Sequence, residues 1–287
     1  MSELSDLALK YAYAGAHVFD GSLTVLHAMH FDTPRYLSRD LTAHVLSELE
    51  NAKLTVQKEL KAYVRSILGS AVDALSVTYR VTDILPSDAI LQLVDTNAMD
   101  LVVMGTHGYS GVKWWMLGSV TESVLHQSKV PVFAVRKDIA GFIDASRPDE
   151  WPRIRHILCP CNMTDAAAHA LQVAVVMAGR FNAQLTALWS LEAKEPGGEQ
   201  EFQEWIHSVI ADLATVIPVI RRGEAAGQVI GAARELNCDL IVISAHYQPF
   251  EQGIVVGRTT ERVLRHAPVP TLTVPYNCEC LVSSAAR

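Results

Sequence analysis

The glycine-rich segment Gly105–Ser119 holds the residues of this chain whose types and spacing could do chemistry. Three of its glycines and its last serine follow the pattern G-x2-G, nine residues, then G-S. The apolar run 100–104 before it is typical of a buried strand, and Ser119 with Glu122 forms a capping box that predicts the start of a helix. Glycines between a strand and a helix N-terminus gather backbone N–H groups and a positive dipole around one point. This arrangement favours an anion, phosphate above all.

This spacing resembles the nucleotide-binding signature of the ATP-binding branch of the universal stress protein family. The resemblance implies an α/β, Rossmann-like fold and an adenine nucleotide, ATP in type, as the ligand. A merely structural turn is the alternative for a glycine-rich loop of this kind. The residues that the resemblance implies for nucleotide contact are Ala28, Met104, Gly105, His107, Gly108, Gly118, Ser119, Val120 and Thr121.

Catalytic signatures give no competing assignment. The sequence contains no G-x4-G-K-[ST], no H-E-x-x-H and no G-x-S-x-G, so P-loop, zincin and α/β-hydrolase chemistry have no support. His107 could act as an acid or base near its unperturbed pKa of about 6.5, but no carboxylate within the motif is positioned to orient it. We therefore expect no catalytic residue and at most weak ATP hydrolysis.

Composition narrows the class of protein. The chain has 287 residues, of which 49% are hydrophobic and 19% charged, and this is typical of one or two globular domains. A net charge of -7, with no basic cluster longer than Arg221–Arg222, argues against a nucleic-acid partner. No apolar run reaches the roughly 18 residues of a membrane span. The first residues lack the pattern of a signal peptide, so we expect a cytoplasmic protein.

The cysteines allow two interpretations. Cys159 and Cys161 form one C-x-C pair, and Cys278 and Cys280 form another, so four thiolates could hold zinc. However, the first pair lies in an apolar, strand-like stretch where small buried thiols are common, and neither pair has the usual C-x2-C spacing. We favour buried thiols and expect no metal site.

The sequence repeats itself. Residues 100–107 recur 139 positions later as 239–246, and residues 124–135 recur at the same offset. Earlier matches, such as 23–26 with 185–188, lie 162 positions apart, so the first half is longer in its middle. Short apolar strands alternate with amphipathic helices in both halves, which predicts βαβ units and parallel sheets. We expect two domains, 1–137 and 153–277, joined by a linker.

The repeat also predicts individual elements. The resemblance implies the strand order 3-2-1-4-5 in each domain and pairing of the two domains through their last strands, 131–136 and 269–274; it also allows a homodimer. In the first half, we expect helices at 5–19, 40–69, 87–97 and 119–127, and strands at 23–29, 76–82, 100–105 and 131–136.

The first half is expected to lack its first strand. The second half opens with a strand at 155–161, and the 162-residue offset places its counterpart upstream of Met1. Either the protein begins further upstream or the sheet is rearranged, because an absent central strand leaves backbone groups that cost about 1–3 kcal/mol each if buried and unpaired. The resemblance places an adenine-contacting aspartate at the end of that strand. We therefore expect weaker ATP binding than in an intact family member.

The second half carries an altered copy of the glycine-rich segment. Gly105 becomes Ser244, Gly108 becomes Tyr247 and Ser119 becomes Arg258, while only one glycine remains, as Gly257. Side chains at Ser244 and Tyr247 obstruct close backbone approach and disfavour positive φ. Asn162 stands where the resemblance places the adenine-contacting aspartate. We expect this half to bind no nucleotide, or a different ligand, and to have a structural role.

These observations predict a tandem universal stress protein that binds ATP in its first domain and acts through protein contacts. One alternative is a nucleotide-free stress adaptor whose surfaces recruit a partner. A less favoured alternative is a slow ATP hydrolase, which would need a catalytic base that the sequence does not show.

Overall fold

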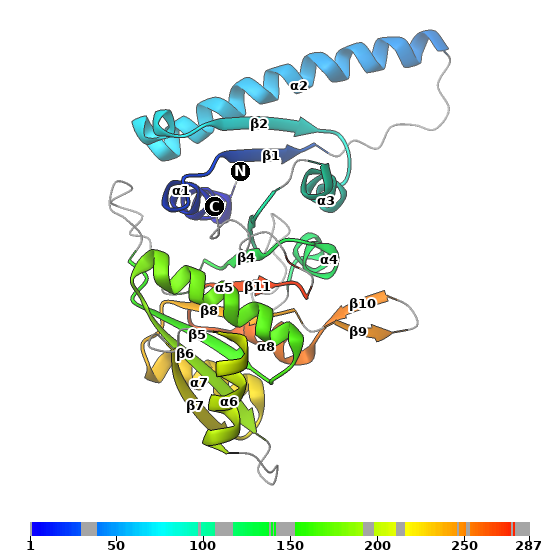
Figure 1. The fold of residues 1–287 in the computed structure, drawn as a ribbon. Coiled ribbons are helices and arrows are strands. Elements are labelled where there is room, and N and C mark those ends of the chain that lie inside the picture. Colours follow the sequence, from blue (N-terminus) through cyan, green and yellow to red (C-terminus); the bar gives the residue numbers. More distant parts are fainter. Residues whose placement is uncertain are drawn as a thin grey trace.

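The structure is a computed structural model. It describes residues 2–29, 39–96, 99–106, 117–137, 139, 141, 153–191, 198–210, 216–245, 247–250, 253–276 and 278, with the backbone alone for 39–46, 247–250 and 253–256. Helices cover parallel sheets in both halves of the chain, so the protein is of the α/β class (Figure 1).

The second half forms one continuous sheet. Its strands lie in the order β7-β6-β5-β8-β11, which is the third, second, first, fourth and fifth strand along this half, and all neighbours are parallel. The elements are β5 (His156–Cys161), α5 (Asp165–Phe181), β6 (Gln184–Leu191), α6 (Glu199–Val209), β7 (Val216–Arg222), α7 (Ala225–Glu235), β8 (Leu240–Ser244), α8 (Arg258–His266) and β11 (Thr271–Val274). Side chains cap two of these helices. The Thr164 hydroxyl accepts a hydrogen bond from the N–H of Ala167 at the start of α5, and the Glu224 carboxylate accepts two at the start of α7.

The first half contains the elements that the repeat predicts, each within two residues of its expected bounds. The resemblance between the halves therefore extends from sequence to secondary structure. The elements are α1 (Glu3–Val18), β1 (Leu23–Ala28), α2 (Arg39–Leu68), the 3-10 helix η1 (Gly69–Ala74), β2 (Val77–Thr82), α3 (Pro86–Thr96), β3 (Val102–Gly105), α4 (Ser119–Gln127) and β4 (Val132–Val135).

The halves join through their last strands, as expected. β4 pairs antiparallel with β11, with Phe133 opposite Leu272, and β3 pairs parallel with β4. The result is a seven-stranded sheet in the order β3-β4-β11-β8-β5-β6-β7. The core of the second half extends into this junction, because Phe133 and Tyr11 belong to the same buried cluster as Ile157.

The strands of the first half are divided between two sheets. β1 and β2 pair with each other, parallel and in register along six residues, as a separate two-stranded sheet under α2 (Figure 1). β3 belongs to the seven-stranded sheet, so β1 and β3 are not hydrogen-bonded to each other. In the second half, β5 lies between the equivalent strands, β6 and β8. That a first strand belongs between β1 and β3 stays a prediction.

A hairpin that the sequence did not predict follows β8. Strands β9 (Tyr247–Phe250) and β10 (Gly253–Val256) pair antiparallel, with Tyr247 opposite Val256. β10 contacts α4 of the first half. The hairpin occupies the part of the second half that corresponds to the glycine-rich loop.

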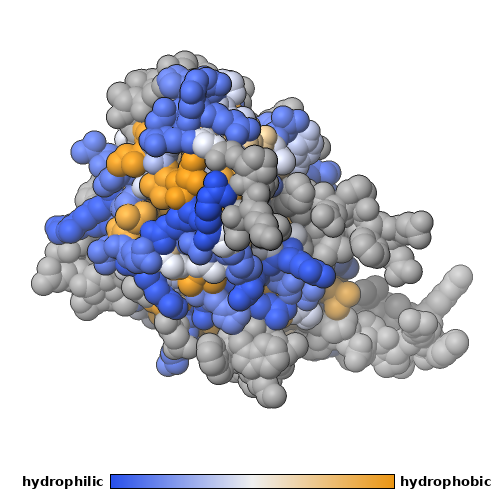
Figure 2. Space-filling model, turned by 90° about the horizontal axis from the view of Figure 1, so that it is seen from below, coloured by the Kyte–Doolittle hydropathy of each residue, from blue (hydrophilic) through white to orange (hydrophobic). Residues whose placement is uncertain are grey.

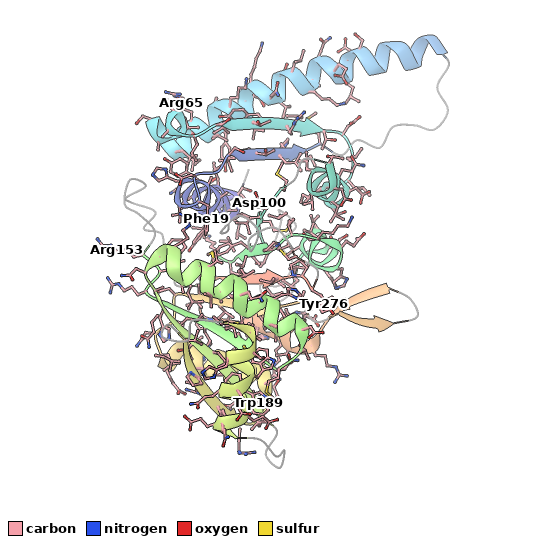
Figure 3. All side chains as sticks on the ribbon, viewed as in Figure 1. Phe19, Arg65, Asp100, Arg153, Trp189 and Tyr276 are labelled. Carbon is pink, nitrogen blue, oxygen red and sulfur yellow. The ribbon has the colours of Figure 1, made fainter. Side chains whose placement is uncertain are left out.

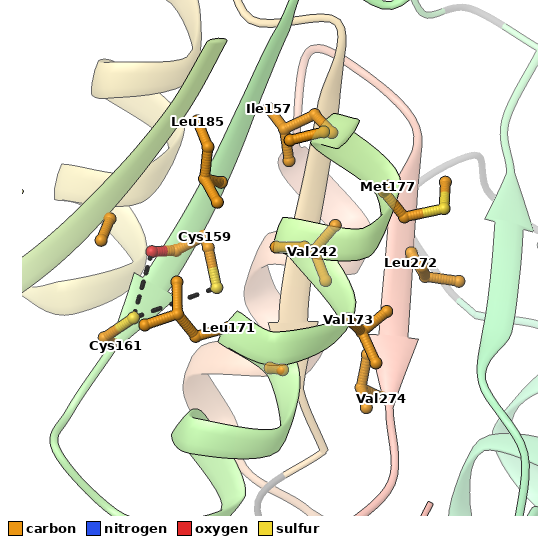
Figure 4. Packing of buried hydrophobic residues seen from close by; sticks show 14 of the residues in the cluster. Ile157, Cys159, Cys161, Leu171, Val173, Met177, Leu185, Val242, Leu272 and Val274 are labelled. Atoms are coloured by element: carbon orange, nitrogen blue, oxygen red, sulfur yellow. Dashed lines mark hydrogen bonds between the residues drawn. The ribbon is translucent and has the colours of Figure 1, made fainter. Parts of the chain in front are cut away.

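The cysteines that the structure describes are buried, and Cys159 and Cys161 lie within the core (Figure 4); Cys280 lies outside the described residues. Cys159 and Cys161 are buried in β5, their sulfur atoms 3.9 Å apart, and burial raises the pKa of the Cys161 thiol. A neutral buried thiol is a poor metal ligand, because metals bind the thiolate. Among the described residues, no three histidine, cysteine or acidic side chains form a group that could hold a metal ion.

The described surface carries scattered apolar residues. Figure 2, seen from below, shows mainly hydrophilic residues around a small group of hydrophobic ones. The large hydrophobic side chains that are exposed, Leu54, Leu85, Ile217 and Tyr276, come from separate parts of the chain. No helix within the described ranges is both long and apolar enough to cross a membrane.

Phe133→Ala is expected to destabilise the junction between the halves by about 3–5 kcal/mol, the range for removing a buried phenylalanine ring. The ring is 5% exposed, and its centroid lies 5.1 Å from that of Tyr11. Urea unfolding followed by circular dichroism measures the loss. Tyr276→Ala removes an aromatic side chain that is 41% exposed and serves as the control. An equal loss of stability in both variants would contradict the prediction that Phe133 stabilises the junction.

Candidate functional site

Hydrogen bonds hold the two ends of the glycine-rich segment together. The chain leaves β3 at Gly105, and the N–H of Thr106 donates to the carbonyl of Val135, 2.9 Å away. On the return, the N–H of Gly118 donates to the carbonyl of Thr106, 2.8 Å away. The hydroxyl of Thr121 donates to the carbonyl of Gly105, 3.0 Å away, and ties the first turn of α4 to the end of β3.

The helix cap differs from the sequence prediction. Gly118, with φ -67° and ψ 146°, occupies the N-cap position of α4, and no side chain caps the helix. Ser119 is the first helical residue and is exposed, so the predicted capping box is wrong. The physical reason is that Gly118 takes the extended cap conformation, which leaves the serine inside the helix. Among the described residues, no side chain accepts a hydrogen bond from the first-turn N–H groups, unlike those of α1, α5 and α7.

Three predicted residues lie around one cavity. Ala28 ends β1, while Met104 and Gly105 end β3, and all three line a cavity of about 340 Å³. Gly118, Ser119, Val120 and Thr121 follow at the cap and first turn of α4. His107 and Gly108 lie outside the described residues. The structure thus brings most predicted residues to the carboxyl edge of β1 and β3, where α/β folds commonly bind ligands.

Sequence reasoning missed the apolar lining of this cavity. Helices α1 and α3 contribute Leu9 and Ile90 among other residues, and Leu60 and Tyr63 come from α2. Their apolar periodicity predicts a helix face toward the sheet, but not that a cavity remains beneath it. No motif marks these residues.

The second half repeats the frame of the site but not its loop. The hydroxyl of Thr260 donates to the carbonyl of Ser244 at 3.0 Å, as Thr121 does to Gly105, and Gly257 caps α8. In place of the loop lies the β9–β10 hairpin, whose backbone groups pair with each other. The N–H groups used in that ladder are unavailable to an anion.

Serine at position 244 does not strain the backbone, contrary to the sequence prediction. Among the described glycines, only Gly69 and Gly223 have positive φ, so Gly105 does not need the left-handed region. Ser244 is accommodated at the end of β8, opposite Val274, as Gly105 is opposite Val135. Serine at this position therefore adds a side chain near the loop without straining the backbone. Asn162, exposed after β5, accepts a hydrogen bond from the hydroxyl of Thr164 at 2.7 Å.

His27, which lines the cavity from β1, is expected to make the stability of the folded chain depend on pH. Burial is the main cause that lowers the pKa of its imidazole below the usual 6.5. The unfolded chain therefore binds a proton more readily than the folded chain in the pH range just below 6.5, so stability falls as the pH drops through that range.

His27→Gln is expected to reduce this loss of stability between pH 7.5 and 5.5. Urea midpoints at several pH values measure it, and His207→Gln, at an exposed histidine of α6, is the control. A pH dependence that His207→Gln reduces as much as His27→Gln would contradict the assignment to His27.

Two Rossmann-like α/β units, joined through antiparallel last strands and carrying a glycine-rich strand-to-helix connection in the first, define the class of protein. The chain belongs to the universal stress protein family, whose family model matches residues 1–136 and 153–275.

Relatives agree with this assignment. A universal stress protein of Mycolicibacterium smegmatis is 24% identical over 289 residues, which cover 94% of this chain and 92% of the relative. One from Methanocaldococcus jannaschii is 29% identical over 150 residues, 47% of this chain and 90% of the relative. The crystal structure of a universal stress protein from Archaeoglobus fulgidus matches with a TM-score of 0.71 at 20% identity, covering 96% of each chain, and so supports the fold.

Proposed function

We propose that the protein binds an adenine nucleotide of the ATP type and acts through protein contacts that depend on the bound state. The phosphates lie at the segment Gly105–Ser119, and the adenine side lies toward Ala28. The two domains of the proposal are residues 1–137, which bind, and 153–277, which support them. The observation that carries the proposal is the convergence of the end of β3 with the start of α4, whose first turn is capped by no side chain among the described residues.

Each residue has a physical role in this proposal. Gly105, Gly108 and Gly118 let the backbone approach the phosphates, since they have no Cβ. The first-turn N–H groups of Ser119, Val120 and Thr121 point along the helix axis toward the anion, where the positive end of the dipole favours negative charge. His107 lies within the loop, and Met104 lines the cavity from β3.

The contrast between the halves argues for one site per chain. In the second half, the hairpin uses its own backbone groups, and Arg258 stands in place of Ser119. Arginine could meet an anion, but without a loop of free N–H groups it offers only one charged contact. The second half therefore has a supporting role in this proposal, through the β4–β11 junction.

Nucleotide released from protein purified without added ligand tests the proposal. Denaturation followed by chromatography identifies the nucleotide, and calorimetry with ATP, ADP and AMP measures affinity and stoichiometry. One site per chain, with affinity that falls as phosphates are removed, supports it. Absence of binding by all three nucleotides would instead favour the adaptor, and rapid turnover of ATP would favour the hydrolase.

A further inference from the structure

The β9–β10 hairpin is separate from the main sheet of the second half. Among the described strands, β9 and β10 pair only with each other, as a two-stranded sheet of their own. In Figures 1 and 3 the hairpin stands out from the body of the second half, on the side where α4 lies. A two-stranded hairpin alone is at best marginally stable in water, and packing against a helix stabilises it. The order of this hairpin therefore depends on the element that it packs against.

The helix beside the hairpin belongs to the first half. β10 contacts α4, the helix that follows the glycine-rich segment. β10 ends at Val256, and the next residue, Gly257, caps α8. α8 in turn packs against the first half, because Leu264 belongs to the same buried cluster as Val124 and Leu125 of α4. The hairpin is thus linked to α4 directly through β10 and indirectly through α8.

The repeat shows that this contact joins two unlike parts of the halves. Leu125 and Leu264 are counterparts, 139 positions apart, so α4 and α8 meet at the junction as equivalent helices. The segments before the two helices are not equivalent, because α4 follows the glycine-rich segment and α8 follows the hairpin. One helix pair therefore lies between the proposed nucleotide site and the hairpin.

The start of α4 is where a nucleotide would act on this helix. Among the described residues no side chain caps its first turn, and a bound phosphate would accept hydrogen bonds from the N–H groups there. A ligand that orders α4 also supports what packs on α4, and a hairpin that holds α4 favours the ligand in return. We propose that nucleotide binding at α4 is coupled to the pairing of β9 with β10, so that the hairpin opens more often when the nucleotide is absent. This inference rests on the proposed function and adds its regulation.

Hydrogen exchange with and without ATP measures the coupling. We expect a saturating concentration of ATP to slow amide exchange in β9 and β10 about fivefold or more, since fivefold is the lower end of typical coupling between two sites. Helix α6, which contacts α5 and β7 in the same half, is the internal control and should change much less. Equal slowing in α6 and in the hairpin would indicate a general stabilisation by the ligand and would overturn the proposal.

A variant of the hairpin tests the coupling in the reverse direction. Val255→Pro fixes φ at about −65° and removes an N–H group within β10, so the pairing of this strand with Gln248 should be lost. Because coupling between two equilibria is reciprocal, ATP should bind this variant more weakly by about the factor by which ATP slows exchange in the hairpin. Val255→Thr keeps a β-branched residue and should bind ATP like the unaltered protein. Unchanged affinity in Val255→Pro would contradict the coupling.

Calorimetry and melting separate the possible failures. If ATP binds and exchange in the hairpin does not change, the coupling is wrong and the nucleotide site stands. If ATP does not bind to the unaltered protein, the proposed function and the coupling are both wrong. The melting temperature of Val255→Pro should stay close to that of Val255→Thr, because the hairpin lies outside the seven-stranded sheet. A large fall would show that the hairpin supports the second half itself, and it would also contradict the proposal.

Discussion

Replacing Ser119 with aspartate is expected to weaken ATP binding at least about 100-fold, which corresponds to about 2.7 kcal/mol. The side chain is exposed at the first position of α4, beside the proposed phosphates. Two like charges 4 Å apart repel by about 4 kcal/mol at the effective dielectric constant of a protein surface, before screening by salt. The folded protein should keep its stability, because a negative charge at a helix N-terminus interacts favourably with the dipole.

Arg258→Asp supplies the matched control. It places the same charge at the first position of α8, after the same glycine cap, in the half that is proposed not to bind. Calorimetry at constant ionic strength should find that this variant binds ATP like the unaltered protein. Similar losses in both variants would indicate a long-range effect of charge, and no loss in Ser119→Asp would place the phosphates elsewhere.

Much of the fold could be predicted because the two halves of the sequence contain the same order of strands and helices. The helix that begins at Ser119 and ends at Gln127 has the predicted bounds, since Gly118 before it and Pro131 after the following turn leave little choice. The pairing of β4 with β11 was likewise expected from the resemblance. The bounds of this helix depend on short-range sterics and periodicity, which a sequence contains directly, whereas the strand pairing was expected only from the resemblance.

Other features depend on competition between similar energies. Gly118 and Ser119 can each serve as a helix cap, and the hydrogen bond from the Gly118 N–H to the Thr106 carbonyl favours the glycine. The β9–β10 hairpin forms from a segment that the repeat aligns with a loop. A signal for it was present, since Ile254–Val256 is a run of β-branched residues, which favour strands.

The residues at the strand ends of the candidate site could be predicted, but the cavity between β1 and β3 could not. Ala28 and Gly105 meet because parallel strands end at the same edge of a sheet. The cavity between β1 and β3 depends on how far α1 and α3 fill the space beside the strands. That distance follows from the packing of many side chains, which no motif specifies.

A large effect on stability is expected from Asp239, the aspartate that accepts hydrogen bonds at the start of β5. Asp239→Ala should destabilise the second half by about 2–4 kcal/mol, because it leaves the N–H groups of Arg155 and His156 without their charged acceptor. His156 is buried, and its ring also bonds the Leu236 carbonyl and the Thr186 hydroxyl, so a displaced strand would disturb a second set of contacts. Denaturant-dependent amide exchange in β5 and β6 measures the loss.

Asp100→Ala is the matched control in the first half. The Asp100 side chain is exposed, so its removal should change the stability of the protein by less than about 0.5 kcal/mol. A cost equal to that of Asp239→Ala would contradict the assignment of that loss to the hydrogen bonds at the start of β5.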